Sequence, residues 1–189
     1  MAGLERKEPD RWGYTRYAVV LFLAEEERRK VDTVRVHLPI PVAMIPAHVT
    51  VKGSFDSPGN LDEVRRCVRE VASSTRPFDV ELVRVAVWGK TVVYEAAVSP
   101  EIRTLHDALY DAIEPVTRNV YGDEAGERFR PHMTVCQELP AGAVEEAERL
   151  ARALDIAKRF RIGAMQLMAL VGPRHGGHWE MVEEFPFVG

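Results

Sequence analysis

Two short segments with the same pattern, nearly half the chain apart, constrain the fold more than any other feature. They read Pro-Ala-His-Val-Thr-Val over residues 46–51 and Arg-Pro-His-Met-Thr-Val over residues 130–135. Each lies in a short apolar run that favours a β-strand, in which residues i and i+2 point to the same face. The histidine and the threonine of each segment therefore share one face, while the apolar residues between and after them face a core.

The elements predicted around these segments also repeat. Each motif strand is followed by a turn, a helix, a long strand, a turn and a returning strand, which defines one unit at about residues 46–98 and a second at about residues 128–187. This pattern indicates an internal duplication. A pseudo-two-fold relation between the units would place both motif strands across one cleft, where ligand sites concentrate. The repeated parts are a helix over 61–74 with strands over 78–88 and 91–98, and a helix over 143–157 with strands over 160–171 and 178–187.

The remaining elements follow from periodicity and from turn residues. A continuous apolar run predicts a buried strand over residues 17–24, and helical spacing predicts a helix over 25–37. A second helix begins with Pro100 at its first position and extends to about residue 116, before a loop over 118–127. Residues 1–15 read as a polar lead-in, so residues 16–189 are expected to form one domain.

Composition limits the classes of partner. With 189 residues, 46% of them apolar, the chain can bury a substantial core, and its net charge of −4 argues against a broad basic face for duplex DNA. Cys67 and Cys136 suggest free thiols in a reducing compartment. Residues 1–14 lack a signal-peptide core, and no apolar run is long enough to span a membrane. We therefore expect a cytoplasmic monomer without a membrane partner.

The paired motifs suggest general acid–base chemistry, because imidazole titrates near working pH. One neutral histidine of the pair His48 and His132 would take a proton from an attacking hydroxyl or water, and the other, protonated, would give a proton to the leaving oxygen. The near symmetry leaves open which histidine does which. Thr50 and Thr134 would donate hydrogen bonds to the non-bridging oxygens of a phosphoryl group. This scheme requires no metal and no cofactor.

Three further residues are candidates for substrate binding. Lys52 lies two positions after Thr50, and Arg130 lies two positions before His132, so strand alternation predicts one cation beside each motif. Tyr121 could stack on a base. Cys136 takes the place of Lys52 in the second segment and is interpreted as a small buried residue rather than a nucleophile.

Two other functions are compatible with the sequence. The same cleft could hold a nucleotide or RNA end without turnover, as a binding module. Alternatively, His175, His178 and Cys136 could bind a metal, although two histidines three residues apart without matching ligands are a weak signal. A loop at the rim of a ligand site is the other interpretation of residues 172–178.

The two motifs resemble the paired His-x-Thr signatures of the two-histidine (2H) phosphoesterase superfamily, in particular its RNA 2′,5′-ligase-like and cyclic phosphodiesterase branch. The resemblance extends from the strand at residue 17 to residue 187, and includes the segments 102–109 and 129–132. One departure is visible, because Lys52-Gly-Ser-Phe follows the first motif where the family often has an apolar residue and then Phe-Leu-Gly. This difference bears on the choice of substrate more than on the chemistry.

The resemblance implies an α+β, bilobal, duplicated fold, with two antiparallel-rich sheets facing a central cleft and helices packed on the outside. It also implies a metal-independent phosphoesterase acting on 2′,3′-cyclic phosphates or 2′,5′-phosphodiester linkages of nucleotides or RNA ends. The residues that the resemblance assigns to this chemistry are His48, Thr50, His132 and Thr134.

Overall fold

The computed structural model describes residues 9–11, 13–56, 61–120 and 126–188. Within this part of the chain there are four α-helices, all of them predicted, and nine β-strands, two more than the sequence predicts. No helix of this part is long and apolar enough to cross a membrane. The helices are α1 (Glu25–Arg35), α2 (Leu61–Ser74), α3 (Pro100–Ile113) and α4 (Val144–Ala153). The strands are β1 (Tyr14–Phe22), β2 (His48–Asp56), β3 (Phe78–Trp88), β4 (Thr91–Ala96), β5 (Arg118–Asn119), β6 (His132–Cys136), β7 (Arg159–Ile162), β8 (Ala164–Val171) and β9 (His178–Pro186).

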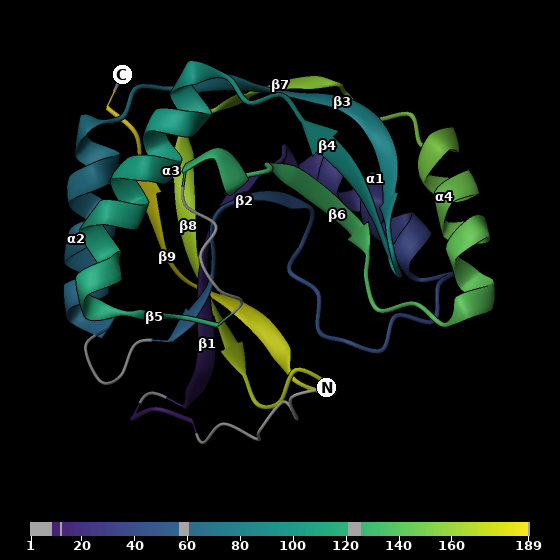
Figure 1. The fold of residues 1–189 in the computed structure, drawn as a ribbon, viewed down its shortest axis with the longest axis horizontal. Helices are drawn as coiled ribbons and strands as arrows, with labels where there is room; N and C mark the ends of the chain where they lie inside the picture. The colour runs from purple at the N-terminus through teal and green to yellow at the C-terminus, as the bar shows by residue number, and fades with distance from the viewer. Residues whose placement is uncertain (1–8, 12, 57–60, 121–125, 189) are drawn as a thin grey trace.

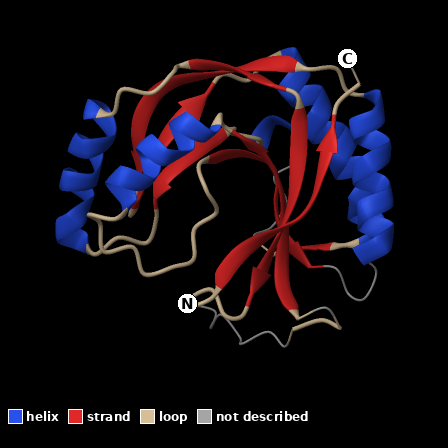
Figure 2. Cartoon of the chain, turned by 180° about the vertical axis from the view of Figure 1, so that it is seen from behind, coloured by secondary structure: helices blue, strands red, loops and turns tan. Residues whose placement is uncertain are grey.

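The strands pair in the order β7-β3-β4-β6-β2-β1-β8-β9, with β5 beside β2, and every pairing is antiparallel. The sheet curls into an arch with the helices on its outer side, α2 and α3 at one end and α1 and α4 at the other (Figures 1 and 2). The α+β fold class is therefore confirmed. The two expected sheets are joined at their centre, where β2 and β6 share one registered pair, Val49 and Met133.

The two sequence units do not correspond to the two lobes. The β3–β4 hairpin of the first unit pairs with β6 and β7 of the second, while the β8–β9 hairpin of the second unit pairs with β1, next to β2. Each lobe therefore combines strands from both halves of the chain. This exchange makes the two motif strands direct neighbours at the centre of the sheet.

Several element boundaries differ from the prediction for identifiable reasons. The strand expected over 160–171 is divided at Gly163, so that β7 joins β3 in one lobe and β8 joins β1 in the other. Residues 118–119, expected in a loop, form β5 against β2. The lead-in is shorter than expected, because β1 begins at Tyr14 and the buried hydroxyl of Thr15 donates to the carbonyl of Gly172 at 2.8 Å.

The core lies between the sheet and the helices. The apolar residues of the motif strands, Val49, Val51, Met133 and Val135, are fully buried. Ser99 caps α3 by accepting a hydrogen bond from the backbone N–H of Ile102, ahead of Pro100 at the first helical position, as the sequence indicates. Burial of one face of each motif strand leaves the other face, with its histidine and threonine, toward the concave side.

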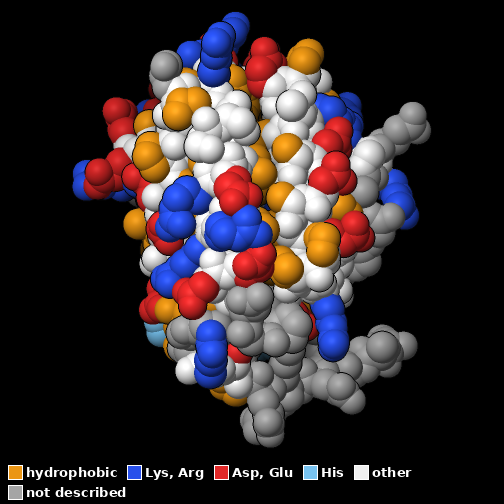
Figure 3. Space-filling model, turned by 90° about the vertical axis from the view of Figure 1, so that its left-hand side faces the viewer, with side chains coloured by type: hydrophobic (Ala, Val, Ile, Leu, Met, Phe, Trp, Pro, Cys, Tyr) orange, Lys and Arg blue, Asp and Glu red, His pale blue; other side chains and the backbone are white. Residues whose placement is uncertain are grey.

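The outer surface over α2 and α3 mixes charges of both signs (Figure 3). Arg66, for example, forms ion pairs with Glu63 and Glu70 on the same helix. Such interspersed charge gives this face no extended basic surface for a nucleic acid duplex.

Replacing Met133 with alanine is expected to destabilise the protein by about 3 kcal/mol, because it removes a fully buried side chain at the junction of the two halves. Met181→Ala is the matched control, since Met181 is 53% exposed on β9 and its loss should change the free energy of unfolding by less than about 0.5 kcal/mol. Urea denaturation measures both values. Equal effects of the two substitutions would contradict this account of the junction.

Candidate active site

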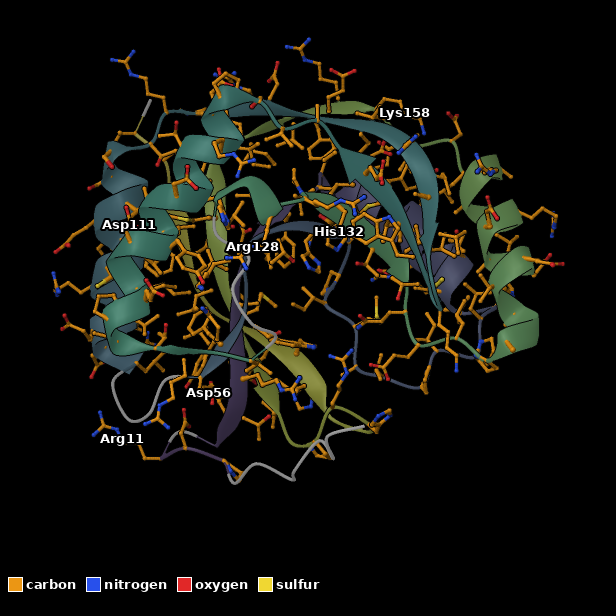
Figure 4. The ribbon with its side chains drawn as sticks, viewed as in Figure 1. Arg11, Asp56, Asp111, Arg128, His132 and Lys158 are labelled. Carbon is orange, nitrogen blue, oxygen red and sulfur yellow. The ribbon has the colours of Figure 1, made fainter. Side chains whose placement is uncertain are left out.

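A cavity of about 430 Å³ brings together His48, Thr50, His132 and Thr134, the four predicted residues. His132 lies inside the arch of the sheet (Figure 4). The antiparallel register around Val49 and Met133 places each histidine across from the threonine of the other strand. Among the described residues that line the cavity, none is acidic. The lining also includes Ala18, Ala43, Met44, Ile45, Val51, Gly53, Ser54, Trp88, Arg128, Phe129, Arg130, Gln137, Arg174 and Trp179.

Both imidazoles are oriented by the backbone in the same way. Nδ1 of His48 donates to the carbonyl oxygen of Pro46 at 2.8 Å, and Nδ1 of His132 donates to that of Arg130 at 2.8 Å. A carbonyl oxygen only accepts, so Nδ1 carries the proton in each neutral ring. Nε2 is then the nitrogen that can accept or release a proton in the cavity.

The surroundings of His48 keep it neutral. Burial lowers its pKa to about 3, and the positive charges of Arg35 and His132 act in the same direction, while the bond to the Pro46 carbonyl opposes them. The hydroxyl of Thr50 lies 3.1 Å from Nε2, to which it donates. His48 is thus uncharged at neutral pH, with Nε2 accepting a hydrogen bond.

His132 is in a different environment. Its ring meets Trp88 edge-on, with the ring centroids 4.6 Å apart, and the guanidinium of Arg130 lies 4.6 Å from the Trp88 centroid. Glu95 accepts hydrogen bonds from the indole N–H at 3.3 Å, from Arg130 at 3.2 Å and from Arg84 at 2.6 Å. The bond from Arg84 holds the pKa of Glu95 below its usual range. Trp88, whose aromatic ring the sequence also offers for stacking on a base, thus forms the wall beside His132.

The prediction that Lys52 shares the face of Thr50 is wrong. Two neighbouring residues of β1, Val20 and Val19, pair with Thr50 and Lys52 of β2. Val51 is therefore an extra residue in β2 at this point. Such a bulge disrupts the alternation of faces. Lys52 is consequently buried on the helix side of the sheet and does not line the cavity. Its ammonium donates to Asn119 and lies 3.7 Å from the ring centroid of Tyr110.

Among the residues that the structure describes, the cations that line the cavity are Arg128, Arg130 and Arg174. Arg130 was predicted, while Arg174 was missed as an individual residue although its loop was interpreted as a rim. Arg174 is held by Glu138, with its Nε 2.9 Å from the carboxylate. Tyr121, the predicted base-stacking residue, lies outside the described residues.

His106 and Cys136 both have structural surroundings. His106 is buried and donates from Nδ1 to the carbonyl of Val51 at 2.7 Å. Its ring stacks on that of Phe129, with the two ring centroids 3.8 Å apart. Cys136 is fully buried, and burial raises the pKa of its thiol, which makes it a poor nucleophile. Within the described part of the chain, Cys136, His175 and His178 are not assembled into a cluster of three metal-ligating side chains.

Comparison with protein families identifies this chain. Residues 23–174 match the family model of the 2′-5′ RNA ligase superfamily. The chain belongs to the 2′-5′ RNA ligase superfamily. The resemblance drawn from the two motifs is therefore confirmed.

Curated relatives and solved structures agree with this assignment. A candidate phosphoesterase of Shouchella clausii is 22% identical over 177 residues, which cover 92% of this chain and 98% of that protein. A second, from Bacillus cytotoxicus, is 23% identical over 138 residues, or 71% of this chain and 75% of that protein. E. coli LigT complexed with phosphate superposes with a TM-score of 0.61 at 16% identity, covering 94% and 99% of the two chains. TT0787 of Thermus thermophilus superposes with a TM-score of 0.65 at 18% identity, covering 93% of this chain and 99% of that chain.

The lowered pKa of His48 predicts a stability that depends on pH. His48 titrates near 6.5 when unfolded but near 3 when folded, so its stabilising contribution is fully present above about pH 6.5 and is lost as the pH falls toward 3. Between about pH 7 and pH 5, the wild type should lose about 2 kcal/mol more unfolding free energy than His48→Gln. Urea titrations at both pH values measure this difference, and equal losses would contradict it.

Proposed function

We propose that this protein is a phosphoesterase that opens 2′,3′-cyclic phosphates or cleaves 2′,5′-phosphodiester linkages of nucleotides or RNA ends. The observation that carries the proposal is the pair of backbone-oriented imidazoles, each with Nδ1 bound to a carbonyl, in one cavity that also holds both threonines. Membership of the 2′-5′ RNA ligase superfamily supports the same chemistry.

The two environments favour an assignment of base and acid. His48 is held neutral, so Nε2 of His48 takes a proton from water while the water oxygen attacks phosphorus. The bond from phosphorus to one ribose oxygen breaks, and protonated His132 supplies a proton to that oxygen. When the substrate binds, the hydroxyl of Thr50 turns from Nε2 of His48 to a non-bridging oxygen, which frees Nε2 for the water. Thr134 donates to another non-bridging oxygen, and both bonds stabilise the negative charge that develops there. Proton exchange with solvent then restores both rings.

The charge of the cavity fits an anionic ligand. Arg128, Arg130 and Arg174 line it together with the two histidines, although the whole chain carries a net charge of −4. A concentration of cations in a concave site raises the local concentration of anions. LigT, which has the same fold, has been crystallised with NADP+, 3′-AMP and ATP, which supports a nucleotide as the ligand class here.

A binding module without turnover is the second candidate, and it uses the same cavity. The hydrogen bond from the Thr50 hydroxyl to Nε2 of His48 favours the enzyme, because this nitrogen is positioned as an acceptor of a transferable proton. Tight binding of a 2′,3′-cyclic nucleotide by the wild type, with no product over several hours, would favour the binding module and contradict the enzyme.

Replacing either catalytic histidine with alanine is expected to lower kcat by about 10³-fold, because each supplies one of two proton transfers. Rates on 2′,3′-cyclic AMP and on a 2′,5′-linked dinucleotide, measured against pH, should follow a bell-shaped curve and persist in EDTA. His178→Ala is the control, since His178 is exposed and does not line the cavity, and it should change kcat less than about twofold. Activity retained in both His48→Ala and His132→Ala would refute the proposal.

The sequence predicts that Lys52 and Arg130 both lie beside substrate, but the bulge in β2 places only Arg130 in the cavity. Arg130→Met should raise KM about fivefold, because it removes a cation from the cavity wall. Lys52→Met should leave KM within about twofold and lower the melting temperature instead, since Lys52 is buried against Asn119 and Tyr110. Steady-state kinetics and thermal denaturation check both, and a raised KM in Lys52→Met alone would contradict this placement.

A further inference from the structure

Arg35, at the last position of α1, reaches into the sheet beneath the two motif strands. Its side chain is 9% exposed. Nε donates to the carbonyl of Val135 at 2.9 Å, and Nη2 donates to that of Thr134 at 2.9 Å. Nη1 donates to the carbonyl of Ile45 at 2.9 Å. One guanidinium therefore joins β6 to the segment that leads into β2.

This bridge lies where two neighbouring strands of the sheet, β2 and β6, have the shortest pairing. β2 and β6 share a single registered pair, whereas β1 and β8 share six. The planar guanidinium presents its donors in a fixed fork, so three carbonyl bonds constrain the relative position of the two segments. Two residues separate Ile45 from His48, and Thr134 is itself a motif residue.

The position of Arg35 also affects the charge of the site. Burial lowers the pKa of its guanidinium, while Asp32, one turn earlier on α1, favours the charged form through an ion pair at 3.1 Å. Of the described side chains, Arg35 from α1 and His132 from β6 act electrostatically on His48, and both lower its pKa. The cations that line the same cavity are Arg128, Arg130 and Arg174.

We propose that Arg35 is a positioning residue that sets the distance between the two His-x-Thr motifs by binding the backbone of both segments. This inference rests on the proposed phosphoesterase function. Arg35 itself does not line the cavity, so it acts through the backbone rather than by touching substrate.

Two substitutions separate geometry from charge. Arg35→Met removes both the bonds and the charge, whereas Arg35→Lys keeps the charge but cannot bond three carbonyls at once. Both should lower kcat on 2′,3′-cyclic AMP by about 30-fold with KM changed less than about threefold, because the substrate contacts remain while the histidines are misplaced. Arg29→Met is the matched control, since Arg29 lies on the same helix, is 77% exposed and pairs only with Glu25 among the described contacts.

Proton NMR of the histidine rings gives a readout that does not need turnover. Removing the nearby positive charge makes protonation easier, so the pKa of His48 should rise in Arg35→Met and stay near the wild-type value in Arg35→Lys. Inorganic phosphate should shift the signals of His48 and His132 together in the wild type and in Arg29→Met, and should not shift both in either Arg35 variant.

The outcomes distinguish the two proposals. A wild type without turnover would overturn the phosphoesterase function, and the phosphate-induced NMR shifts would still decide the role of Arg35. A folded Arg35→Met or Arg35→Lys with kcat within threefold of the wild type would overturn the positioning role. Unfolding of both variants at 25 °C, measured by circular dichroism, would assign Arg35 to stability alone and also overturn it.

Discussion

The site depends on the antiparallel contact of β2 and β6 at Val49 and Met133. This pair points into the core, so the residues on either side of it point into the cavity. Each strand thereby contributes one histidine and one threonine to the same concave surface. The exchange of hairpins between the two sequence units makes this contact possible, because β3–β4 and β8–β9 occupy the outer positions of the sheet and leave the motif strands at its centre.

The part of the site that could be predicted is the part that local backbone geometry determines. A strand with period two places His48 beside Thr50 and His132 beside Thr134 without reference to any partner. Lys52 follows the same rule in the sequence, yet the rule fails there, because the bulge arises from the pairing of β2 with β1. The orientation of His48 and Thr50 was predictable from the motif, whereas that of Lys52 depended on its pairing with Val19, 33 residues earlier in the chain.

Long-range pairing accounts for most of what the sequence did not reveal. The order of helices and strands followed from periodicity, and the fold class followed from the family resemblance. The strands with which each hairpin pairs could not be predicted, since the repeated pattern is the same whether a unit folds on itself or exchanges strands. Trp88, Arg174 and Arg35 come from three separate segments, so their meeting around the motifs has no local sequence signal.

The difference between the two histidines also has its origin outside the motifs. The unequal residues two positions after the threonines, Lys52 and Cys136, are both buried, and neither lines the cavity. The asymmetry comes instead from what packs against each ring. Arg35 and the segment before β2 surround His48, whereas Trp88 and its guanidinium partner lie beside His132. Two motifs with the same histidine and threonine can thus hold their imidazoles in unlike surroundings, because the groups that pack against each ring come from segments outside the motifs.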